Sequence, residues 1–375
     1  MSTASVQMSF PTTVDFGEGS IKNLPRWVAL HGTRALLVTD PGLAQLPVFE
    51  TVRATLEDAN IPFDIYTAVS PNPLDTEAHD GAEYLRQQEC DVVIGLGGGS
   101  ALDGAKAIAL MARHEGHIVD YDDAKGGYEH IHADIPPVIA IPTTAGTGSE
   151  VGRSTVVIDT QRNVKVVVFS PHLMPRIALV DPALHVGMPA WLTAATGMDA
   201  LTHNIEALLS QGYHPLADSI ALGGILEASK GLVRAVENGD DIEARAAMAM
   251  SALMGATAFQ KGLGVIHSLA HPCSTIAGVH HGLANGVLIE TGLRFNRSVS
   301  TVPLAQMART LGLSGDTLDT LADTAIEWVV QLRDRVDIPG SLTAVGVTED
   351  LLPAMIDQAF DDQCHQCNPR PVTKE

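Results

Sequence analysis

Short apolar runs alternate with amphipathic segments through the first half of the chain. Five runs of aliphatic and β-branched residues predict buried strands, at residues 35–39, 61–66, 92–96, 138–141 and 177–180. Between them, apolar residues recur at helical spacing over residues 48–59 and 75–88, and a further helix is predicted to open at Ser100. Strands that alternate with helices predict a parallel, doubly wound (Rossmann-like) sheet.

The pattern changes in the middle of the chain. Residues 155–158 and 164–169 are β-branched runs on either side of a short polar turn, which predicts a β-hairpin. From Trp191 onward the chain shows helical spacing with short Gly, Pro or Asn interruptions and no convincing strand. We therefore expect an α/β domain over residues 1–187 and an all-α domain over residues 188–375.

Composition and charge narrow the class of protein. The chain has 375 residues, of which 45% are hydrophobic, and this length favours two domains over one. Its 23 Lys and Arg against 44 Asp and Glu give a formal net charge of -21, which argues against nucleic acid or an anionic membrane as a partner. The N-terminus lacks the features of a signal peptide, so we expect a cytoplasmic protein. Its four cysteines are too few for a disulfide scaffold, and residues 364–367 form a lone CxxC motif.

A glycine-rich turn connects the predicted strand 92–96 to the helix that follows it. Gly97, Gly98 and Gly99 precede Ser100, and Asp103 lies one turn further on. Glycines let a diphosphate approach the backbone, and the helix N-terminus behind them supplies free N–H groups and a positive dipole. The turn therefore predicts a phosphate site, with a simple tight turn as the alternative; no Walker A motif is present.

A second loop, rich in glycine and hydroxyl groups, follows the predicted strand 138–141. Loops at the carboxyl edge of a parallel sheet are where ligands bind. Its candidate contacts with a nucleotide are Thr143, Thr144, Thr147 and Ser149.

Asp40 ends the predicted strand 35–39. An acidic side chain at such a position can accept hydrogen bonds from the adenosine ribose and repels a 2′-phosphate, so Asp40 predicts a preference for NAD over NADP. The alternative is that this aspartate only begins the turn formed with Pro41 and Gly42.

A candidate metal site lies in the second half of the chain. Asp199 and His203 are four residues apart in a segment of good helix formers, so a helix places both side chains on one face. Further ligands come from two His pairs that spacing alone does not resolve, namely His267 or His271 and His280 or His281. One carboxylate with several imidazoles suits Fe(II), Zn(II), Mn(II) or Co(II) and leaves room for a substrate oxygen. The alternative is an Asp and His pair on a solvated helix face.

In combination, these segments resemble the iron-containing alcohol dehydrogenase family from near the start of the chain to its end. The matching motifs are Gly97–Ser100 with Asp103, Pro142–Glu150, Ala194–His203, and the segments around His267, His271 and His281. The resemblance implies a nucleotide-binding N-terminal domain, a helical metal-binding C-terminal domain and frequent homodimers. It also implies an architecture similar to that of the dehydroquinate synthases.

The resemblance further implies which residues bind the metal and the cofactor. Metal ligands fall on Asp199, His203, His267 and His281, with His271 as a neighbouring non-ligand. The expected metal is Fe2+, with Zn2+ as the alternative. The expected cofactor is NAD, and the residues assigned to it are Asp40, Gly97, Gly98, Gly99, Ser100, Asp103, Thr143, Thr144, Thr147, Ser149 and Lys165.

The reaction expected of such a protein is reversible hydride transfer between a primary alcohol and the nicotinamide, with the metal as a Lewis acid. His271 lies one turn from His267 and is a candidate proton relay, because an imidazole titrates near neutral pH. A structural histidine, hydrogen-bonded within the helix, is the alternative.

Residues 258–264 and 362–369 look most like those of 4-hydroxybutyrate dehydrogenases within the family. Lys261 and Arg153 flank motif segments in an acidic chain, and we expect one of them to bind the carboxylate of a short ω-hydroxy acid. Alternatively both are solvated surface charges, and the substrate is a neutral alcohol or diol such as 1,2-propanediol. A dehydroquinate synthase-like lyase and a non-catalytic metal- or nucleotide-binding protein are the other classes considered.

Overall fold

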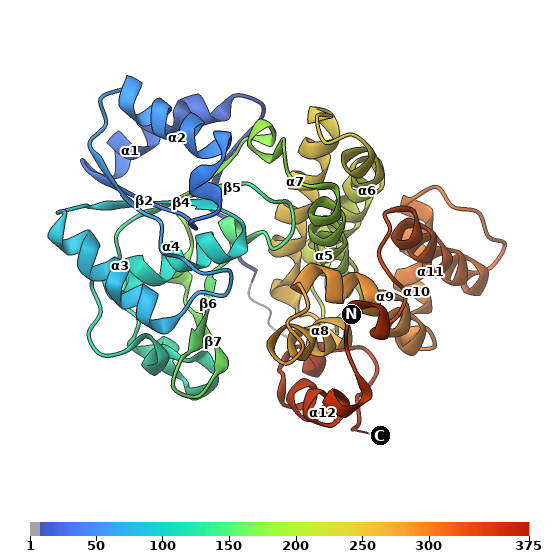
Figure 1. Ribbon diagram of the computed structural model, residues 1–375. Helices are drawn as coiled ribbons and strands as arrows, with labels where there is room; N and C mark the ends of the chain where they lie inside the picture. The colour runs from blue at the N-terminus through green and yellow to red at the C-terminus, as the bar shows by residue number, and fades with distance from the viewer. Residues whose placement is uncertain (1–7, 375) are drawn as a thin grey trace. The chain divides into compact units, whose positions relative to one another are not determined.

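The computed structural model describes residues 8–374, which form two compact units (Figure 1). One unit comprises residues 11–144 and 148–185, and the other comprises residues 8–10, 145–147 and 186–374. The first is α/β and the second is helical, so the fold class predicted from the sequence is confirmed. The functions assigned to the two domains, and the predicted boundary between residues 187 and 188, stay predictions.

A six-stranded parallel sheet forms the centre of the α/β unit. Its strands lie in the order β1 (Thr13–Phe16), β8 (Ile177–Val180), β5 (Val138–Pro142), β4 (Val92–Gly97), β2 (Ala35–Val38) and β3 (Phe63–Tyr66). Every neighbouring pair is parallel. All five strands predicted from apolar runs are present in this sheet.

Helices cover both faces of the sheet. They are α1 (Leu24–His31), α2 (Pro47–Asp58), α3 (Asp75–Gln87) and α4 (Gly99–Met111). Successive side chains of a strand point to opposite faces. Leu37 accordingly belongs to the core formed with α1 and α2, and Leu36 belongs to the core formed with α3 and α4. The strands β2, β4, β5 and β8 are therefore buried on both faces, which is why they appear in the sequence as continuous apolar runs.

The sequence pattern did not predict β1 or α1. β1 lies at the edge of the sheet, and its residues are exposed or only partly buried, so it contains no apolar run. α1 has only eight residues, of which Leu24 and Val28 are buried, and its helical spacing is correspondingly short.

The predicted hairpin is present as β6 (Ser154–Asp159) and β7 (Val164–Phe169), which pair antiparallel. Asn163 in the connecting turn has a φ of 52°, in the left-handed region that asparagine tolerates better than most residues. The hairpin packs on α4 through β6.

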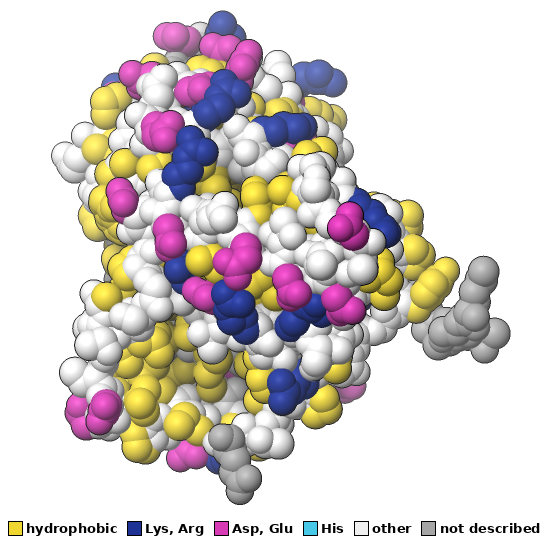
Figure 2. Space-filling view, turned by 90° about the vertical axis from the view of Figure 1, so that its right-hand side faces the viewer, with side chains coloured by type: hydrophobic (Ala, Val, Ile, Leu, Met, Phe, Trp, Pro, Cys, Tyr) yellow, Lys and Arg dark blue, Asp and Glu magenta, His cyan; other side chains and the backbone are white. Residues whose placement is uncertain are grey.

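Helices alone make up the second unit within residues 186–374. They are α5 (Ala190–Leu209), α6 (Pro215–Glu237), α7 (Ile242–Ala258), α8 (Val265–Thr275), α9 (His281–Asn296), α10 (Thr301–Thr310), α11 (Leu318–Arg335) and α12 (Leu352–Asp361), with several short 3-10 segments. No helix among residues 8–374 is long and apolar enough to cross a membrane. On the face drawn in Figure 2, Lys and Arg side chains are scattered among Asp and Glu, and the described residues form no continuous basic patch there.

Helix α5 is buried along most of its length and packs against α6, α7 and α9. Close approach is possible because small residues face it. The amide of Asn204 on α5 donates to the backbone oxygens of Ala200 and Ser251, at 2.8 and 2.9 Å, and thereby ties α5 to α7. A Cβ at Gly224 of α6 would lie 2.0 Å from Asn204 Oδ1. Gly224 thus leaves the space that this buried amide occupies.

We expect Gly224→Ala to lower the melting temperature by several degrees, because the new methyl displaces Asn204. Overpacking of this kind costs about 1–3 kcal/mol. Gly223→Ala on the same helix is the matched control, since its Cβ would meet only the flexible end of Met254. Alanine raises helix propensity by roughly 0.5–1 kcal/mol over glycine, so the control is expected to be neutral or stabilising. Thermal unfolding followed by circular dichroism measures both, and equal effects would contradict this packing argument.

Candidate metal centre and nucleotide loops

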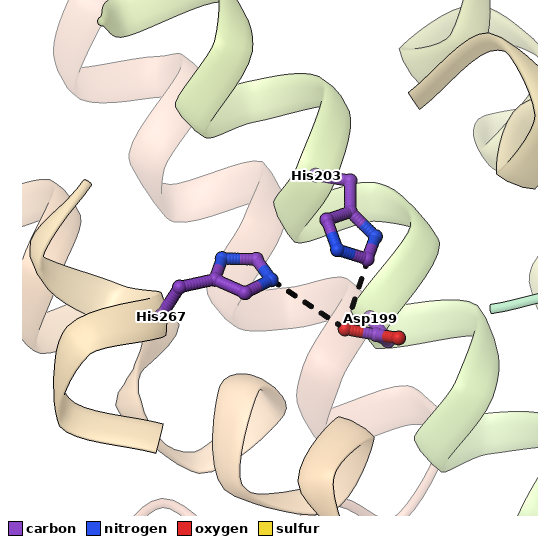
Figure 3. A group of neighbouring side chains, drawn as sticks. All are labelled: Asp199, His203 and His267. Carbon is purple, nitrogen blue, oxygen red and sulfur yellow. Dashed lines mark ion pairs between the residues drawn. The ribbon is translucent and has the colours of Figure 1, made fainter. Parts of the chain in front are cut away.

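The side chains of Asp199, His203 and His267 meet inside the helical unit (Figure 3). Asp199 and His203 come from one face of α5, and His267 comes from the first turn of α8. Asp199 Oδ1 lies 3.9 Å from His203 Nδ1 and 3.8 Å from His267 Nε2. One ligand atom from each residue lies within 4.8 Å of the others, and all three residues are buried. This is a group of nitrogen and oxygen donors able to hold a divalent cation.

His281, the first residue of α9, adds a fourth donor. Its Nε2 lies 3.6 Å from Asp199 Oδ1. His280, which precedes it, instead packs edge-on against the ring of Trp191, with the ring centroids 5.9 Å apart. Spacing left His280 and His281 open as candidates, and the structure brings His281 to the carboxylate.

The amide of Asn285 tests whether this group fits a positive centre. Its Nδ2 lies 2.7 Å from Asp199 Oδ1, 3.3 Å from His267 Nε2 and 3.2 Å from His281 Nε2. Three potential acceptor atoms thus converge on one point. His203 Nδ1 is buried and has no hydrogen-bond partner among the described residues. Converging acceptors and an unsatisfied buried imidazole nitrogen fit a divalent metal.

Electrostatics keep Asp199 and His203 in their metal-binding forms. Burial by itself raises the pKa of the Asp199 carboxyl, but the three histidines and Asn285 outweigh burial and lower that pKa to about 2. Burial lowers the pKa of His203 to about 4, against the attraction of Asp199. At neutral pH the carboxylate is therefore ionised and this imidazole is neutral, which are the states that coordinate metals.

A second carboxylate and histidine pair lies beside the first group. His271 Nδ1 is 2.7 Å from Asp362 Oδ2, and the His271 ring stacks on His281 with centroids 5.3 Å apart. Asp362 also accepts hydrogen bonds from Ser268 Oγ and the Cys364 backbone N–H, at 2.9 and 2.8 Å. His271, Asp362 and Cys364 bring their potential ligand atoms within 4.8 Å of one another. His271 is thus held in one orientation, next to the proposed ligands but not against Asp199.

In the α/β unit, the glycine turn connects β4 to α4 as predicted. Gly97 has a φ of 144°, which L side chains rarely adopt, and a Cβ there would lie 2.6 Å from Ala101. The Thr143 N–H donates to Gly97 O at 3.0 Å, so the two loops are side by side at the carboxyl ends of β4 and β5. Gly98 is the N-cap of α4, without a side-chain cap. Unsatisfied N–H groups at such a helix start suit a phosphate.

Two family models match the chain and together span nearly all of it. "Iron-containing alcohol dehydrogenase" matches residues 11–182, and "Fe-containing alcohol dehydrogenase family, C-terminal" matches residues 193–375. The chain belongs to the iron-containing alcohol dehydrogenase family. It is therefore an NAD-dependent alcohol dehydrogenase with a buried His and Asp metal site that acts on a small alcohol or aldehyde. This class displaces the lyase and the non-catalytic binding protein considered from the sequence.

Named relatives of this alcohol dehydrogenase differ in substrate. The chain is 37% identical to the NAD-dependent methanol dehydrogenase of Bacillus methanolicus, over 97% of this chain and 95% of that protein. It is 39% identical to the 4-hydroxybutyrate dehydrogenase of Cupriavidus necator, over 90% and 88%. A crystal structure of 1,3-propanediol oxidoreductase matches with a TM-score of 0.95 and 35% identity, over 99% of this chain and 97% of the other. Identity at this level does not choose among these substrates.

Several residues assigned to the cofactor already have partners inside the α/β unit. Asp103 accepts from Ser149 Oγ at 2.6 Å and from the Val156 N–H at 3.1 Å, and Lys106 Nζ donates to Ser149 Oγ at 2.7 Å. Burial raises the pKa of Asp103, against the attraction of Lys106. These contacts tie α4 to the hairpin. The cofactor role of Asp103 and Ser149 stays a prediction, with a structural role as its alternative.

Two further nucleotide candidates, Ser100 and Asp40, also have hydrogen-bond partners in the α/β unit. The Ser100 hydroxyl donates to the Pro71 carbonyl, and Asp40 Oδ1 accepts from the Leu43 N–H at 2.8 Å. The Asp40 bond closes the turn after β2, in agreement with the alternative that Asp40 only begins this turn. Burial lowers the pKa of Lys165, against the attraction of Asp103. Coenzyme contacts of all these residues, and of Thr144 and Thr147, stay predictions.

The two cations expected to bind a substrate carboxylate both have local neighbours. Lys261 Nζ lies 2.5 Å from Asp218 Oδ1 and 3.1 Å from the Leu208 carbonyl, and its side chain is 5% exposed. The Arg153 guanidinium lies over the Phe169 ring, 5.0 Å from its centroid, and burial lowers its pKa. Lys261 is thus not the solvated surface charge of the alternative interpretation, and a role for Lys261 or Arg153 in binding a substrate carboxylate stays a prediction.

The sequence analysis missed three polar residues of the candidate metal centre, namely Glu206, Asn285 and Asp362. Glu206 lies three residues after His203, and Asn285 lies four residues after His281, so helical spacing offered a signal for both. Asp362 has no such relation to His271, because it comes from a distant segment of the chain.

We expect His281→Ala to weaken metal binding by more than about tenfold and His280→Ala to leave it unchanged. Mutating a residue that only hydrogen-bonds to a metal ligand typically lowers metal affinity roughly 10–100-fold, and losing a ligand itself should lower it at least as much. Competition with a chromogenic chelator measures the affinity of each variant for Zn2+. Loss of metal from His280→Ala but not from His281→Ala would reverse the assignment.

We expect Glu150→Gln to stabilise the protein more at about pH 8 than at about pH 5. Burial raises the pKa of Glu150 from 4.5 to about 7, against Lys106 and its own backbone. Because the unfolded chain releases this proton at lower pH than the folded protein, stability falls as the pH rises from 4.5 to about 7. The gain at high pH is on the order of 1–3 kcal/mol. Melting temperatures measure it, with the exposed Glu18→Gln as control, and a pH-independent gain would contradict the argument.

Proposed function

We propose that the enzyme interconverts a short primary alcohol and its aldehyde with NAD(H), using Asp199, His203, His267 and His281 as metal ligands. One observation carries the proposal: the donor atoms of Asp199, His267 and His281 converge on the Asn285 amide nitrogen, and His203 brings a further donor atom within 4.8 Å of those of Asp199 and His267. These four residues would hold a divalent metal, which would supply Lewis acidity to a substrate oxygen. The NAD contributes the hydride chemistry.

His271 is the proposed proton carrier of the reaction. Asp362 is held as an anion, because His271, Ser268 and the Cys364 N–H together outweigh burial and lower its pKa. An anionic carboxylate accepts a hydrogen bond from Nδ1–H of His271 and so leaves Nε2 as the atom that takes up or releases a proton. The His271 side chain is 30% exposed, which allows exchange with water. Ser268 and Cys364 hold the Asp362 end of this pair in place.

The ion pair between Lys261 and Asp218 argues for a neutral rather than an anionic substrate. A substrate carboxylate at Lys261 would have to compete with Asp218, which already neutralises the ammonium group. Desolvating a charged substrate group without a free counter-charge is unfavourable. We therefore propose a short neutral alcohol or diol as the preferred substrate. The 4-hydroxybutyrate dehydrogenase among the relatives keeps a short ω-hydroxy acid as the second candidate. The homodimer expected from the resemblance stays a prediction.

We expect the metal-reconstituted enzyme to oxidise NADH with butanal at a kcat/KM at least about tenfold above that with succinic semialdehyde. If Lys261 contacts neither substrate, as proposed, Lys261→Met should leave this ratio of kcat/KM values within about twofold of the wild-type ratio. If Lys261 binds the carboxylate, the same variant should raise KM for succinic semialdehyde well over tenfold and spare butanal, as truncating one partner of a buried pair costs about 2–5 kcal/mol. That outcome would establish the ω-hydroxy acid instead, and absence of NADH oxidation with every aldehyde would remove the proposed reaction.

A further inference from the structure

Helix α5 carries a third polar residue on the face that bears Asp199 and His203. Glu206 follows His203 by three residues, so the three side chains project in the same direction from successive turns. Its carboxylate is almost fully buried, with the residue 3% exposed. Unpaired ionised groups are rarely buried, because removing them from water is costly. The surroundings of this carboxylate must therefore compensate its charge.

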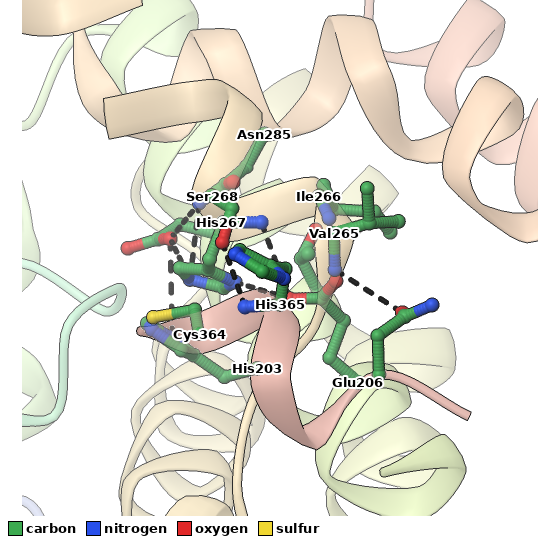
Figure 4. A network of polar contacts seen from close by, with 12 residues as sticks. His203, Glu206, Val265, Ile266, His267, Ser268, Asn285, Cys364 and His365 are labelled. Atoms are coloured by element: carbon green, nitrogen blue, oxygen red, sulfur yellow. Dashed lines mark hydrogen bonds and ion pairs between the residues drawn. The ribbon is translucent and has the colours of Figure 1, made fainter. Parts of the chain in front are cut away.

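Glu206 receives its hydrogen bonds from the beginning of α8 (Figure 4). Oε1 accepts from the Ile266 N–H at 2.7 Å, and Oε2 lies 3.3 Å from the His267 N–H and 2.6 Å from His267 Nδ1. The N-cap of α8 is Gly264, which has no side chain to satisfy these N–H groups. A Cβ at Gly264 would lie 2.7 Å from Oε1. Glycine at this position thus admits the carboxylate from α5.

The contact with Nδ1 determines how His267 presents its other nitrogen. An ionised carboxylate has no proton to donate, so Nδ1 must carry the hydrogen. Nε2 of a neutral imidazole is then the nitrogen with the lone pair, and it is Nε2 that lies 3.8 Å from Asp199 Oδ1. The same carboxylate fixes the backbone of His267 through its N–H. Ring orientation and tautomer are therefore both set from α5.

We propose that Glu206 is a positioning residue that holds His267 in the tautomer and orientation needed to bind the metal. The inference depends on the ligand set proposed above, in which His267 is a direct donor. Helix α5 then supplies two ligands directly and controls a third through Glu206. Outer partners of this kind orient a ligand and raise its basicity.

The pair formed by Asp362 and His271 provides a matched comparison, because His271 lies on the same helix, α8, as His267. It contacts His271 Nδ1 at 2.7 Å, as Glu206 contacts His267 Nδ1 at 2.6 Å, but His271 does not face Asp199. The change from carboxylate to amide is chemically the same at both places. We expect only the change at Glu206 to alter metal binding.

The test is the affinity of the metal-free full-length protein for Zn2+, measured by chelator competition, together with the visible spectrum of the Co2+-loaded protein. We expect Glu206→Gln to weaken Zn2+ binding about 10–100-fold and to alter the Co2+ absorption bands. Both carboxylate oxygens of Glu206 accept hydrogen bonds, whereas the glutamine amide has only one oxygen. Its NH2 group, itself a donor, would face a donor at either Ile266 or His267. Asp362→Asn should stay within about twofold of the wild-type affinity.

A structural control separates positioning from loss of stability. Asn368 Oδ1 accepts from the Val265 N–H at 3.2 Å, so Asn368→Ala loosens the same end of α8 without touching His267. We expect this variant to lower the melting temperature and to leave the Zn2+ affinity unchanged. Wild-type affinity and an unchanged Co2+ spectrum in Glu206→Gln would overturn the inference.

His267→Ala distinguishes failure of the inference from failure of the ligand set. If His267→Ala retains wild-type metal affinity, the ligand set itself is wrong; if it loses metal while Glu206→Gln does not, only the role of Glu206 is wrong. Should Glu206→Gln fail to fold, 15N NMR of the wild-type Zn2+-loaded protein decides. We expect an Nδ1-protonated His267 with Nε2 bound to zinc, and zinc on Nδ1 would overturn the proposal.

Discussion

The burial of the Asp199 carboxylate is the constraint on which the helical unit depends. A full negative charge inside a packed protein is tolerated only where neighbouring groups compensate it. Here α8 and α9 each begin with a turn that delivers an imidazole to the same oxygen, and α9 adds the amide of Asn285 one turn later. The three histidines and the amide outweigh burial and lower the pKa of the Asp199 carboxyl to about 2. A divalent cation bound at their common point would add to this stabilisation, which would link metal binding to the stability of the unit.

Small residues make this convergence sterically possible. A Cβ at Gly282 would lie 2.4 Å from the Ala195 carbonyl of α5, and one at Gly286 would lie 3.2 Å from the Met198 Cβ. These glycines are four residues apart, so they form one flat strip of α9 against α5. Larger side chains there would push α9 away and carry His281 and Asn285 out of reach of Asp199. The low aromatic content of the chain, 4%, agrees with helices that pack through small residues.

A feature of the fold or the site was predictable from the sequence where the contacts that determine it are local along the chain. Strands β2, β4, β5 and β8 were predictable because each is buried and apolar on both faces, whereas β1 is a partly exposed edge strand and left no such signal. Helical spacing placed Asp199 beside His203 correctly, but it could not choose between His267 and His271, which lie one turn apart on α8. That choice depends on where α5 packs. The ion pair between Lys261 and Asp218, 43 residues apart, was hidden for the same reason.

His267 and His271 show how one local interaction produces two different chemical groups. Each imidazole has its Nδ1 against a carboxylate at nearly the same distance, so each presents Nε2 as its reactive nitrogen. Their surroundings differ: the side chain of His267 is 1% exposed and faces the anionic Asp199, whereas that of His271 is 30% exposed. A lone pair buried beside an anion is suited to a cation that stays bound, because water cannot compete for it. A lone pair open to solvent is suited to a proton that must come and go. The sequence spacing of four residues therefore places the metal-site histidine His267 and the proposed proton carrier His271 side by side, and burial together with the position of Asp199 distinguishes their surroundings.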